Sequence, residues 1–399
     1  MATPVFLSAL GVISPVGLGK SQVFETLMAG EYPGVVERND LLVAGAPIHV
    51  GEVTAPLPDV PAELCSYASR NTAMMIATAE EIRDDIEHAI STYGRERIAV
   101  IMGTSTSGMD EVEGAVAIAS ASGELPSTYD FRQNELGSPA EALACYLGLG
   151  GPAFTVSTAC SSSAQALADG RRLLRTGIAD AVLVGGADSL CRLTVNGFHA
   201  LSALSKGRCN PFSRNRDGTM IGEGAALFLM QREEAEIALY GVGASSDAYS
   251  MTSPEPGGKG IELAIRQALT DAGIAPEAID YVQLHGTGTE QNDAVESETV
   301  MRIFGTEVPC SSSKAQLGHT LGAAGAMGAA HCWLSASDTF NPDGLLPPHV
   351  WDGEAEEGLL SDSLVRPGQQ TNSIAKRIFL SNAFAFGGNN VTLVLGRWP

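Results

Sequence analysis

A cysteine in a turn offers a nucleophile in this chain of 399 residues. Cys160 follows a β-rich run that ends at Thr158, and it precedes a helical pattern that extends from Ala164 to Arg175. Unpaired N–H groups and the positive end of the helix dipole favour a thiolate at such a position, and the same N–H groups can stabilise an oxyanion. Because free cysteines are also common packing residues, other polar residues must decide between the two roles.

Two histidines and a lysine also lie in turns. His285 follows the buried run 281–284 and opens a Gly/Thr turn, so its ring lies at the end of a strand, where α/β proteins place their sites. Lys314 and His319 precede a helix rich in Gly and Ala. Burying this many polar groups costs stability unless they serve one another or a ligand. The sequence therefore predicts that Cys160, His285, Lys314 and His319 share one catalytic site.

The elements that position these residues occur twice along the chain. Helical windows at 71–90 and 260–272 each precede a β-rich run, and each run ends in a G-T-x-T turn, at Gly103–Thr106 and at Gly286–Thr289. The pattern predicts an α/β protein built from two similar halves, although common αβ turns can also coincide.

We place the two halves at residues 1–234 and 235–399. No linker rich in Pro, Ser or Gly separates them, so we expect them to pack into one body. Residues 245–260 form a long loop rich in Pro and Gly, and such loops commonly form sites. Residues 378–396 contain two apolar strands around a Gly-Gly-Asn-Asn turn, which predicts a hairpin.

Composition and charge exclude several classes of protein. The chain has 24 Lys and Arg against 46 Asp and Glu, a formal charge of -22, and no basic run of the kind that binds nucleic acid. No Lys or Arg precedes Lys20, so a signal peptide is not expected, and residues 317–334 carry two histidines, which favours a buried helix over a membrane span. Seven scattered cysteines without CxxC or zinc spacing indicate reduced thiols, a cytoplasmic location and no metal.

Several widely spaced motifs run along nearly the whole chain. They are GVISPVG near the N-terminus, TACSSS at Thr158–Ser163, NPFSRNRDG at Asn210–Gly218, SSDAYSMTSP at Ser245–Pro254, HGTGT at His285–Thr289, K-x-x-x-G-H at Lys314–His319 and FxFGGNN at Phe384–Asn390. In type and order they resemble the motifs of β-ketoacyl-acyl-carrier-protein synthases of the Cys-His-His type.

This resemblance implies a thiolase-like fold, a five-layered αβαβα body of two similar halves. It implies an acyltransferase in which Cys160 takes an acyl chain from a carrier-protein thioester. A malonyl extender then loses CO2, and its enolate attacks the acyl-enzyme to give a β-ketoacyl product. The implied partner is acyl carrier protein, loaded with acyl or malonyl groups through phosphopantetheine. A homodimer is expected, with a heterodimer with a ketosynthase-like subunit as the alternative, and no cofactor or metal.

The resemblance also assigns roles to residues of the site. His285 and His319 would donate hydrogen bonds to the extender carbonyl and stabilise the enolate as neutral rings. Lys314 would orient His319 and hold positive charge nearby. The backbone N–H groups of Cys160 and Phe386 would form an oxyanion hole, and the Phe386 ring would gate the pocket.

Substrate delivery is assigned to other positions. Thr287 and Thr289 would meet the phosphopantetheine arm. An acidic carrier protein must approach a chain of charge -22, so we expect a local basic patch to receive it. The candidates are Arg70, Lys206, Arg208 and Arg214.

Three departures from the family pattern leave the pathway open. Gly328 stands where the family usually has Glu, so the usual charge partner of the lysine is absent. The gating loop 385–389 has Ala and Asn where Gly and Thr are usual. TACSSS is closer to polyketide-type synthases than to some fatty-acid enzymes, so the product is either a fatty acid or a polyene or polyketide.

Four alternatives were weighed against this interpretation. A chain-length-factor-like partner subunit would lack the nucleophile; the retained Cys160 argues against it, whereas the missing Glu at position 328 leaves it as the alternative function. A degradative thiolase needs a second C-terminal cysteine, and none follows Cys332. A synthase that initiates chains would have Asn at one of the two histidine positions. A metal site built from His285, His319 and Asp293 fits by residue type but lacks close ligand spacing.

Overall fold

Two sheets with the same strand order form the centre of the computed structural model, which describes residues 4–43, 45–373 and 376–399. The first sheet has the order β6 (Ala153–Val156), β5 (Ile98–Gly103), β7 (Ala181–Asp188), β8 (Gly224–Gln231) and β1 (Val5–Ser14). The second has the order β11 (Cys310–Ser311), β10 (Tyr281–Gln283), β12 (Ile378–Ala385), β13 (Asn389–Arg397) and β9 (Ile237–Ser246). Counted within its own half, each sheet therefore has its strands in the order 3-2-4-5-1.

Strand directions repeat as well. In the first sheet β5 pairs in parallel with β6 and β7, while β8 is antiparallel to β7 and β1. In the second sheet β10 pairs in parallel with β11 and β12, while β13 is antiparallel to β12 and β9. The two sheets join where Val5 and Phe6 of β1 pair with Leu239 and Ala238 of β9.

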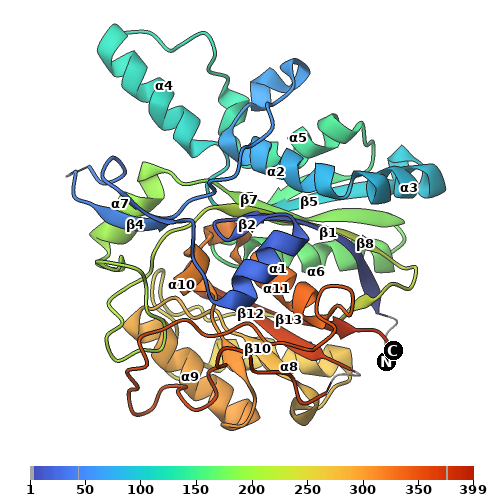
Figure 1. Ribbon diagram of the computed structural model, residues 1–399. Coiled ribbons are helices and arrows are strands. Elements are labelled where there is room, and N and C mark those ends of the chain that lie inside the picture. Colours follow the sequence, from blue (N-terminus) through green and yellow to red (C-terminus); the bar gives the residue numbers. More distant parts are fainter. Residues whose placement is uncertain (1–3, 44, 374–375) are drawn as a thin grey trace.

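Helices cover both sheets and fill the space between them, giving the five layers visible in Figure 1. One outer layer contains α2 (Arg70–Glu81), α3 (Arg83–Tyr93) and α5 (Ser138–Leu147), and the other contains α8 (Lys259–Ala272) and α9 (Glu290–Phe304). The middle layer contains α6 (Ser162–Arg175) and α11 (Ala324–Ala336). The expectation of a five-layered αβαβα fold is confirmed.

Burial explains why the strands are almost wholly apolar. Every residue of β7 is buried, because helices cover both faces of its sheet. The Gly and Ala content of α11 has a second cause, since a Cβ at Gly325 would lie 2.6 Å from the backbone nitrogen of Ala164 on α6. The two middle helices therefore need small residues where they meet.

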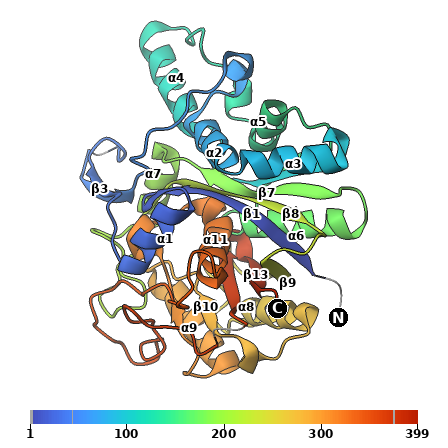
Figure 2. The same ribbon diagram turned by 45° about the vertical axis from the view of Figure 1, so that its right-hand side comes forward.

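The remaining elements lie around this body. They are α1 (Lys20–Ala29), β2 (Gly17–Leu18), the β3–β4 ribbon (Val35–Arg38 and Ile48–Gly51), α4 (Met109–Ser122), α7 (Arg192–Ala200) and the short α10 (Lys314–Leu317). Figure 2 shows α4 projecting beyond the outer layer that contains α2 and α5. Within the described ranges, no helix combines the length and the hydropathy needed to cross a membrane.

Three expectations about elements can be compared with the structure. The helical window 71–90 is divided between α2 and α3, because Ile82 leaves the helical region at φ -117°. The helix expected over 317–334 begins only at Ala324, after α10 and a 3-10 turn. The hairpin is confirmed, with β12 and β13 paired antiparallel from Ile378–Gly396 to Ala385–Asn389.

Candidate active site

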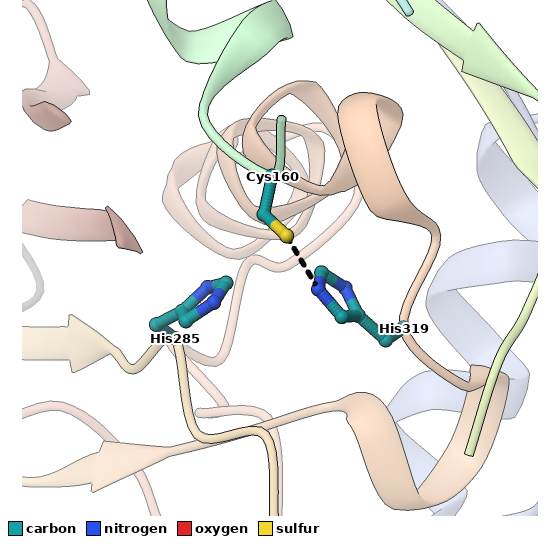
Figure 3. A group of neighbouring side chains, drawn as sticks. All are labelled: Cys160, His285 and His319. Atoms are coloured by element: carbon teal, nitrogen blue, oxygen red, sulfur yellow. Dashed lines mark hydrogen bonds between the residues drawn. The ribbon is translucent and has the colours of Figure 1, made fainter. Parts of the chain in front are cut away.

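Cys160 projects from a sharp turn between β6 and α6. Ala159 has a left-handed backbone at φ 52°, which is unusual for a residue with a side chain. The backbone N–H of Thr158 donates to Ser162 Oγ at 2.9 Å and so closes the turn. Cys160 is 6% exposed, two residues before α6 begins. The turn aims the thiol away from the helix and toward the second half of the molecule (Figure 3).

Both predicted histidines converge on this thiol. His319 Nε2 lies 3.0 Å from Cys160 Sγ, and Figure 3 shows the two rings on the same side of the cysteine. The ring centroids of His285 and His319 are 5.3 Å apart, with the rings nearly perpendicular. Residues 125 and 159 positions away in sequence from Cys160 thus form one cluster, as expected.

Lys314 contacts His285. Its ammonium donates to the backbone carbonyl of His285 and lies 3.5 Å from the Nδ1 atom of the same ring. The family resemblance implied that Lys314 orients His319, but the side-chain hydrogen bonds of Lys314 in the structure are to His285. An ammonium facing Nδ1 needs an acceptor there, so the proton of neutral His285 belongs on Nε2.

Burial keeps both histidines neutral. It lowers the pKa of His285 well below its ordinary value, and the charge of Lys314 and the neighbouring ring lower it further. Burial and Lys314 likewise hold the pKa of His319 well below its usual range. Neutral imidazoles can each donate one hydrogen bond without acting as imidazolium acids.

The thiol itself is not a resting thiolate. Burial raises the pKa of Cys160 to about 11, although Lys314 and the backbone N–H groups of Phe386 and Cys160 oppose this rise. The helix dipole favours a thiolate at Cys160, but desolvation by the whole fold outweighs it. Cys160 must therefore lose its proton during the reaction, and His319 is the base within reach.

Glu296 on α9 is a buried carboxylate of the site that sequence reasoning missed. It accepts hydrogen bonds from the backbone N–H groups of His285 and Gly286, each at 2.7 Å, and from Asn382 Nδ2 at 3.3 Å. Burial raises its pKa to about 7, although the two N–H groups and Lys314 lower it. An acidic residue eleven positions after His285, within a helix, was the available signal.

Phe386 lies beside the nucleophile in the turn between β12 and β13. Its ring stacks on Phe198 with centroids 5.3 Å apart and planes at 16°, and its backbone N–H faces Cys160 Sγ. The loop that follows β9 supports this turn, because the N–H of Gly387 donates to the Met251 carbonyl at 2.8 Å. The long loop 245–260, which was predicted to form part of the site, is therefore bonded to the turn that carries Phe386.

A cavity of about 420 Å³ leads to the nucleophile. Cys160, His285 and His319 line it together with Thr287 and Thr289, whose hydroxyl oxygens are 2.9 Å apart. Its lining also includes the carboxylate residues Asp217, Asp247 and Glu290. The structure thus places both predicted threonines on the route to Cys160.

The geometry argues against the metal site considered from sequence. Asp293 accepts hydrogen bonds from the N–H groups of Phe212 at 2.8 Å and Gly288 at 3.2 Å, so it serves the backbone. One ligand atom each from Cys160, His285 and His319 lies within 4.8 Å of the others, a spacing that a metal could use. The ammonium of Lys314 beside His285 opposes a cation at that place.

The four docking candidates have different surroundings. Arg70 is ion-paired with the fully buried Glu223, so its charge is used inside the protein. Arg208 lies over the ring of Tyr32, with its guanidinium carbon 4.8 Å from the ring centroid. Arg214 is exposed and lies 3.9 Å from Glu354. Lys206 is exposed on the loop after α7.

Comparisons with known proteins agree with this geometry. Residues 43–236 match the family model for the N-terminal domain of beta-ketoacyl synthase, and residues 235–345 match that for its C-terminal domain. The 3-oxoacyl-[acyl-carrier-protein] synthase 2 of Coxiella burnetii is 30% identical, with 98% of each chain covered. The nodulation protein E of a Rhizobium species is 28% identical, also with 98% of each chain covered.

Solved structures extend the comparison. A chain of the complex between the ketosynthase ApeO and its chain length factor ApeC from Xenorhabdus doucetiae matches with a TM-score of 0.93 and 43% identity over 99% of this chain and 98% of that one. The ishigamide ketosynthase/chain length factor matches with a TM-score of 0.87 and 29% identity over all of both chains. Because both domain models match and a relative at 30% identity spans 98% of each chain, the chain belongs to the β-ketoacyl synthase family.

Proposed function

We propose that this chain condenses an acyl group held on Cys160 with a malonyl group carried by acyl carrier protein, releasing CO2 and forming a β-ketoacyl thioester. The observation that carries the proposal is the 3.0 Å approach of His319 Nε2 to Cys160 Sγ, with a second neutral histidine at the same end of the cavity. Such a site supplies a nucleophile, a base and two donors for an enolate oxygen.

The first half-reaction loads the nucleophile. His319 takes the proton of the Cys160 thiol, and the sulfur attacks the carbonyl carbon of the acyl thioester. The backbone N–H groups of Cys160 and Phe386 hold the developing oxyanion. The bond to the phosphopantetheine sulfur then breaks, and that sulfur leaves with the proton from His319.

The second half-reaction forms the carbon–carbon bond. The malonyl carboxylate leaves as CO2, and its bonding electrons become the enolate, whose oxygen accepts a hydrogen bond from neutral His285 and one from neutral His319 after the ring proton of His319 has moved from Nδ1 to Nε2. The enolate carbon attacks the acyl group on Cys160. The Cys160 sulfur then leaves as a thiolate and takes up one proton, while the charge of Lys314 favours each anionic state.

Partners follow from the same assignment. Thr287 and Thr289 contact the phosphopantetheine arm of acyl carrier protein in this proposal. The chain works as a dimer, either with a second copy or with a chain-length-factor-like subunit as in the two solved ketosynthase structures. In a heterodimer this chain is the catalytic subunit, because it retains Cys160. Exposed Val116 and Ile118 on α4 support a protein contact on that side.

Two further expectations belong to this proposal. Residues 1–234 and 235–399 form the two halves, one supplying the nucleophile and the other both histidines and the lysine. All seven cysteines are free, which supports a cytoplasmic location, where thiols stay reduced. The product is a fatty acid or a polyene or polyketide, and the mass of the acyl group trapped on Cys160 would distinguish these classes.

The test is the intact mass of the protein after incubation with acyl-loaded carrier protein. The unmodified chain gains one acyl group, and Cys160→Ala gains none, whereas Cys65→Ala, which removes an exposed thiol, is acylated normally. Cys160→Gln still decarboxylates malonyl thioester, because the histidines remain. An acyl group that persists in Cys160→Ala and maps to another cysteine would contradict the proposal.

A further inference from the structure

A second, much smaller cavity lies behind Lys314, where α11 has no side chain at Gly328. Its volume is about 20 Å³. Its polar lining comes from Gln283, Ser313, Lys314, Thr320 and Asn382, all of which are buried. A volume of about 10–15 Å³ is enough to hold one water molecule, provided that polar partners are present. The cavity therefore has the size and the lining of a site for one water.

Two of these lining residues have unused hydrogen-bonding capacity among the described residues. Thr320 Oγ1 is buried and has no partner there. The Lys314 ammonium has three hydrogens, and its two side-chain contacts both go to His285, at the carbonyl and at Nδ1. A buried donor without an acceptor costs about 1–3 kcal/mol, so an acceptor in this cavity would be stabilising.

The charges around the small cavity favour a neutral molecule in it. A cation in the cavity would be repelled by the charge of Lys314, a residue that lines it. An anion would join Glu296 and Asp293, two buried carboxylates that already act on Lys314. Water can accept from Lys314 and donate to a hydroxyl or amide oxygen without adding charge.

We propose that one ordered water molecule occupies this cavity and is the positioning partner of Lys314, in the place where a longer residue at 328 would put its own side chain. This inference rests on the condensing function proposed above. The water holds the ammonium in register with the carbonyl of His285 but, being neutral, does not stabilise its charge. The alkaline limit of condensation is therefore set by the deprotonation of Lys314.

The groups that act on Lys314 come from every element around it. Burial lowers the pKa of Lys314, and acidic neighbours only partly offset this. The titratable residues concerned are Glu296 and Asp293 on α9, His285 after β10, His319 after α10, Cys160 before α6, Cys209 before Phe212, and His331 on α11. Since condensation uses the charged form, activity falls as the pH rises through the pKa of Lys314.

The experiment compares Gly328→Glu with the matched neutral variant Gly328→Gln, using the pH profile of malonyl-thioester decarboxylation. A carboxylate in the cavity raises the pKa of Lys314, so Gly328→Glu moves the alkaline limb upward by about one pH unit. Gly328→Gln displaces the water without charge and leaves the limb where it is. Equal alkaline limbs in both variants would overturn the proposal.

A second measurement does not depend on these variants folding, since a Cβ at Gly328 would lie 2.7 Å from Ser381 Oγ. A crystal structure of the unmodified protein at high resolution should show one water peak within hydrogen-bonding distance of Lys314 Nζ. An empty cavity, or an ion in it, would overturn the water assignment. Either result is independent of whether Cys160 accepts an acyl group, so it separates this inference from the proposed function.

Discussion

The two halves of the molecule contain the same backbone turn at the start of their middle helices, yet only one turn carries a nucleophile. Ala159 and Leu321 have left-handed φ values of 52° and 50°, and each lies three residues before the start of its helix, α6 or α11. The residue after Ala159 is Cys160, and the residue after Leu321 is Gly322. The fold therefore supplies the strained turn twice, and the side chain decides its use.

The two helix turns differ in what their residues face. Cys160 faces the substrate cavity, whereas the N–H of Gly322 donates to the carboxylate of Asp188 at 2.5 Å. Asp188 also accepts from the backbone N–H groups of Ser105 and Thr106, at 2.9 and 2.8 Å. The N–H group of Gly322, the donor in the second half that could have held an oxyanion, is therefore occupied by a carboxylate of the protein itself.

The G-T-x-T turns show the same contrast. In the first half, the hydroxyls of Thr104 and Thr106 donate to Asp188 at 2.5 and 2.7 Å. In the second half, the equivalent hydroxyls of Thr287 and Thr289 line the cavity that leads to Cys160. The first turn is bonded to buried Asp188, and the second lines the cavity. The same backbone turn thus serves stability in the first half, where its hydroxyls bond to Asp188. It serves substrate binding in the second half, where its hydroxyls face the cavity.

The largest expected effect comes from placing alanine at Gly322 and at Cys160, the equivalent positions of the two helix turns. A Cβ at Gly322 would lie 2.6 Å from Ser105 N and 2.7 Å from Asp188 Oδ2, so Gly322→Ala should lower the free energy of unfolding by about 3 kcal/mol. Cys160→Ala should change that free energy by only about 1 kcal/mol while abolishing acylation. Denaturant unfolding and acylation mass together measure both. Similar losses of stability would show that the two turns are not used differently.

Much of this arrangement could be predicted from the sequence. Cys160 and His285 each follow a β-rich run, and Cys160 and His319 each precede a helical segment, so local pattern predicted that they lie at strand ends and helix starts. The repeated G-T-x-T turns, at the end of β5 and after β10, pointed to two similar halves. Local pattern identifies the strand or helix next to each site residue. The position of that element in the fold then determines where the residue lies.

Other features depend on contacts between distant segments. The partner of Lys314 could not be read from spacing, because β10 brings His285 next to it from 29 positions away. Glu296 is polar yet buried, so it does not stand out from an ordinary helix surface. The raised pKa of Cys160 depends on desolvation by the whole fold, which no local motif describes.

A smaller effect is expected from the two pairs of threonines. Thr104→Val with Thr106→Val removes two hydrogen bonds to buried Asp188 and should lower the free energy of unfolding by about 2–3 kcal/mol, with the KM for carrier-protein substrate nearly unchanged. Thr287→Val with Thr289→Val should do the reverse, raising KM several-fold at nearly constant stability. Thermal unfolding and steady-state kinetics measure both pairs. If both pairs of substitutions changed stability and KM in the same way, the two turns would not have different roles.

The smallest effect concerns how the carrier protein reaches the open half of the site. Arg70 is bound to Glu223, whereas Lys206 and Arg208 lie on the loop after α7, and Ser202 and Ala203 of this loop line the cavity. An acidic partner is repelled by the charge of -22 at long range, but salt screens that repulsion beyond about 8–10 Å, so a local pair of cations can dominate at contact.

Lys206→Glu with Arg208→Glu should therefore raise the KM for acyl carrier protein by about fivefold, most at low salt, while a short acyl-pantetheine substrate reacts as before. The matched control is Arg83→Glu with Arg266→Glu, which changes the net charge equally at positions that do not line the cavity. If the control raised KM as much, long-range repulsion and not contact would govern binding. If both substrates lost activity in the Lys206 and Arg208 variant, the loop would be supporting the catalytic site itself, because Arg208 lies against Tyr32 and its neighbour Cys209 donates to the carbonyl of Lys314.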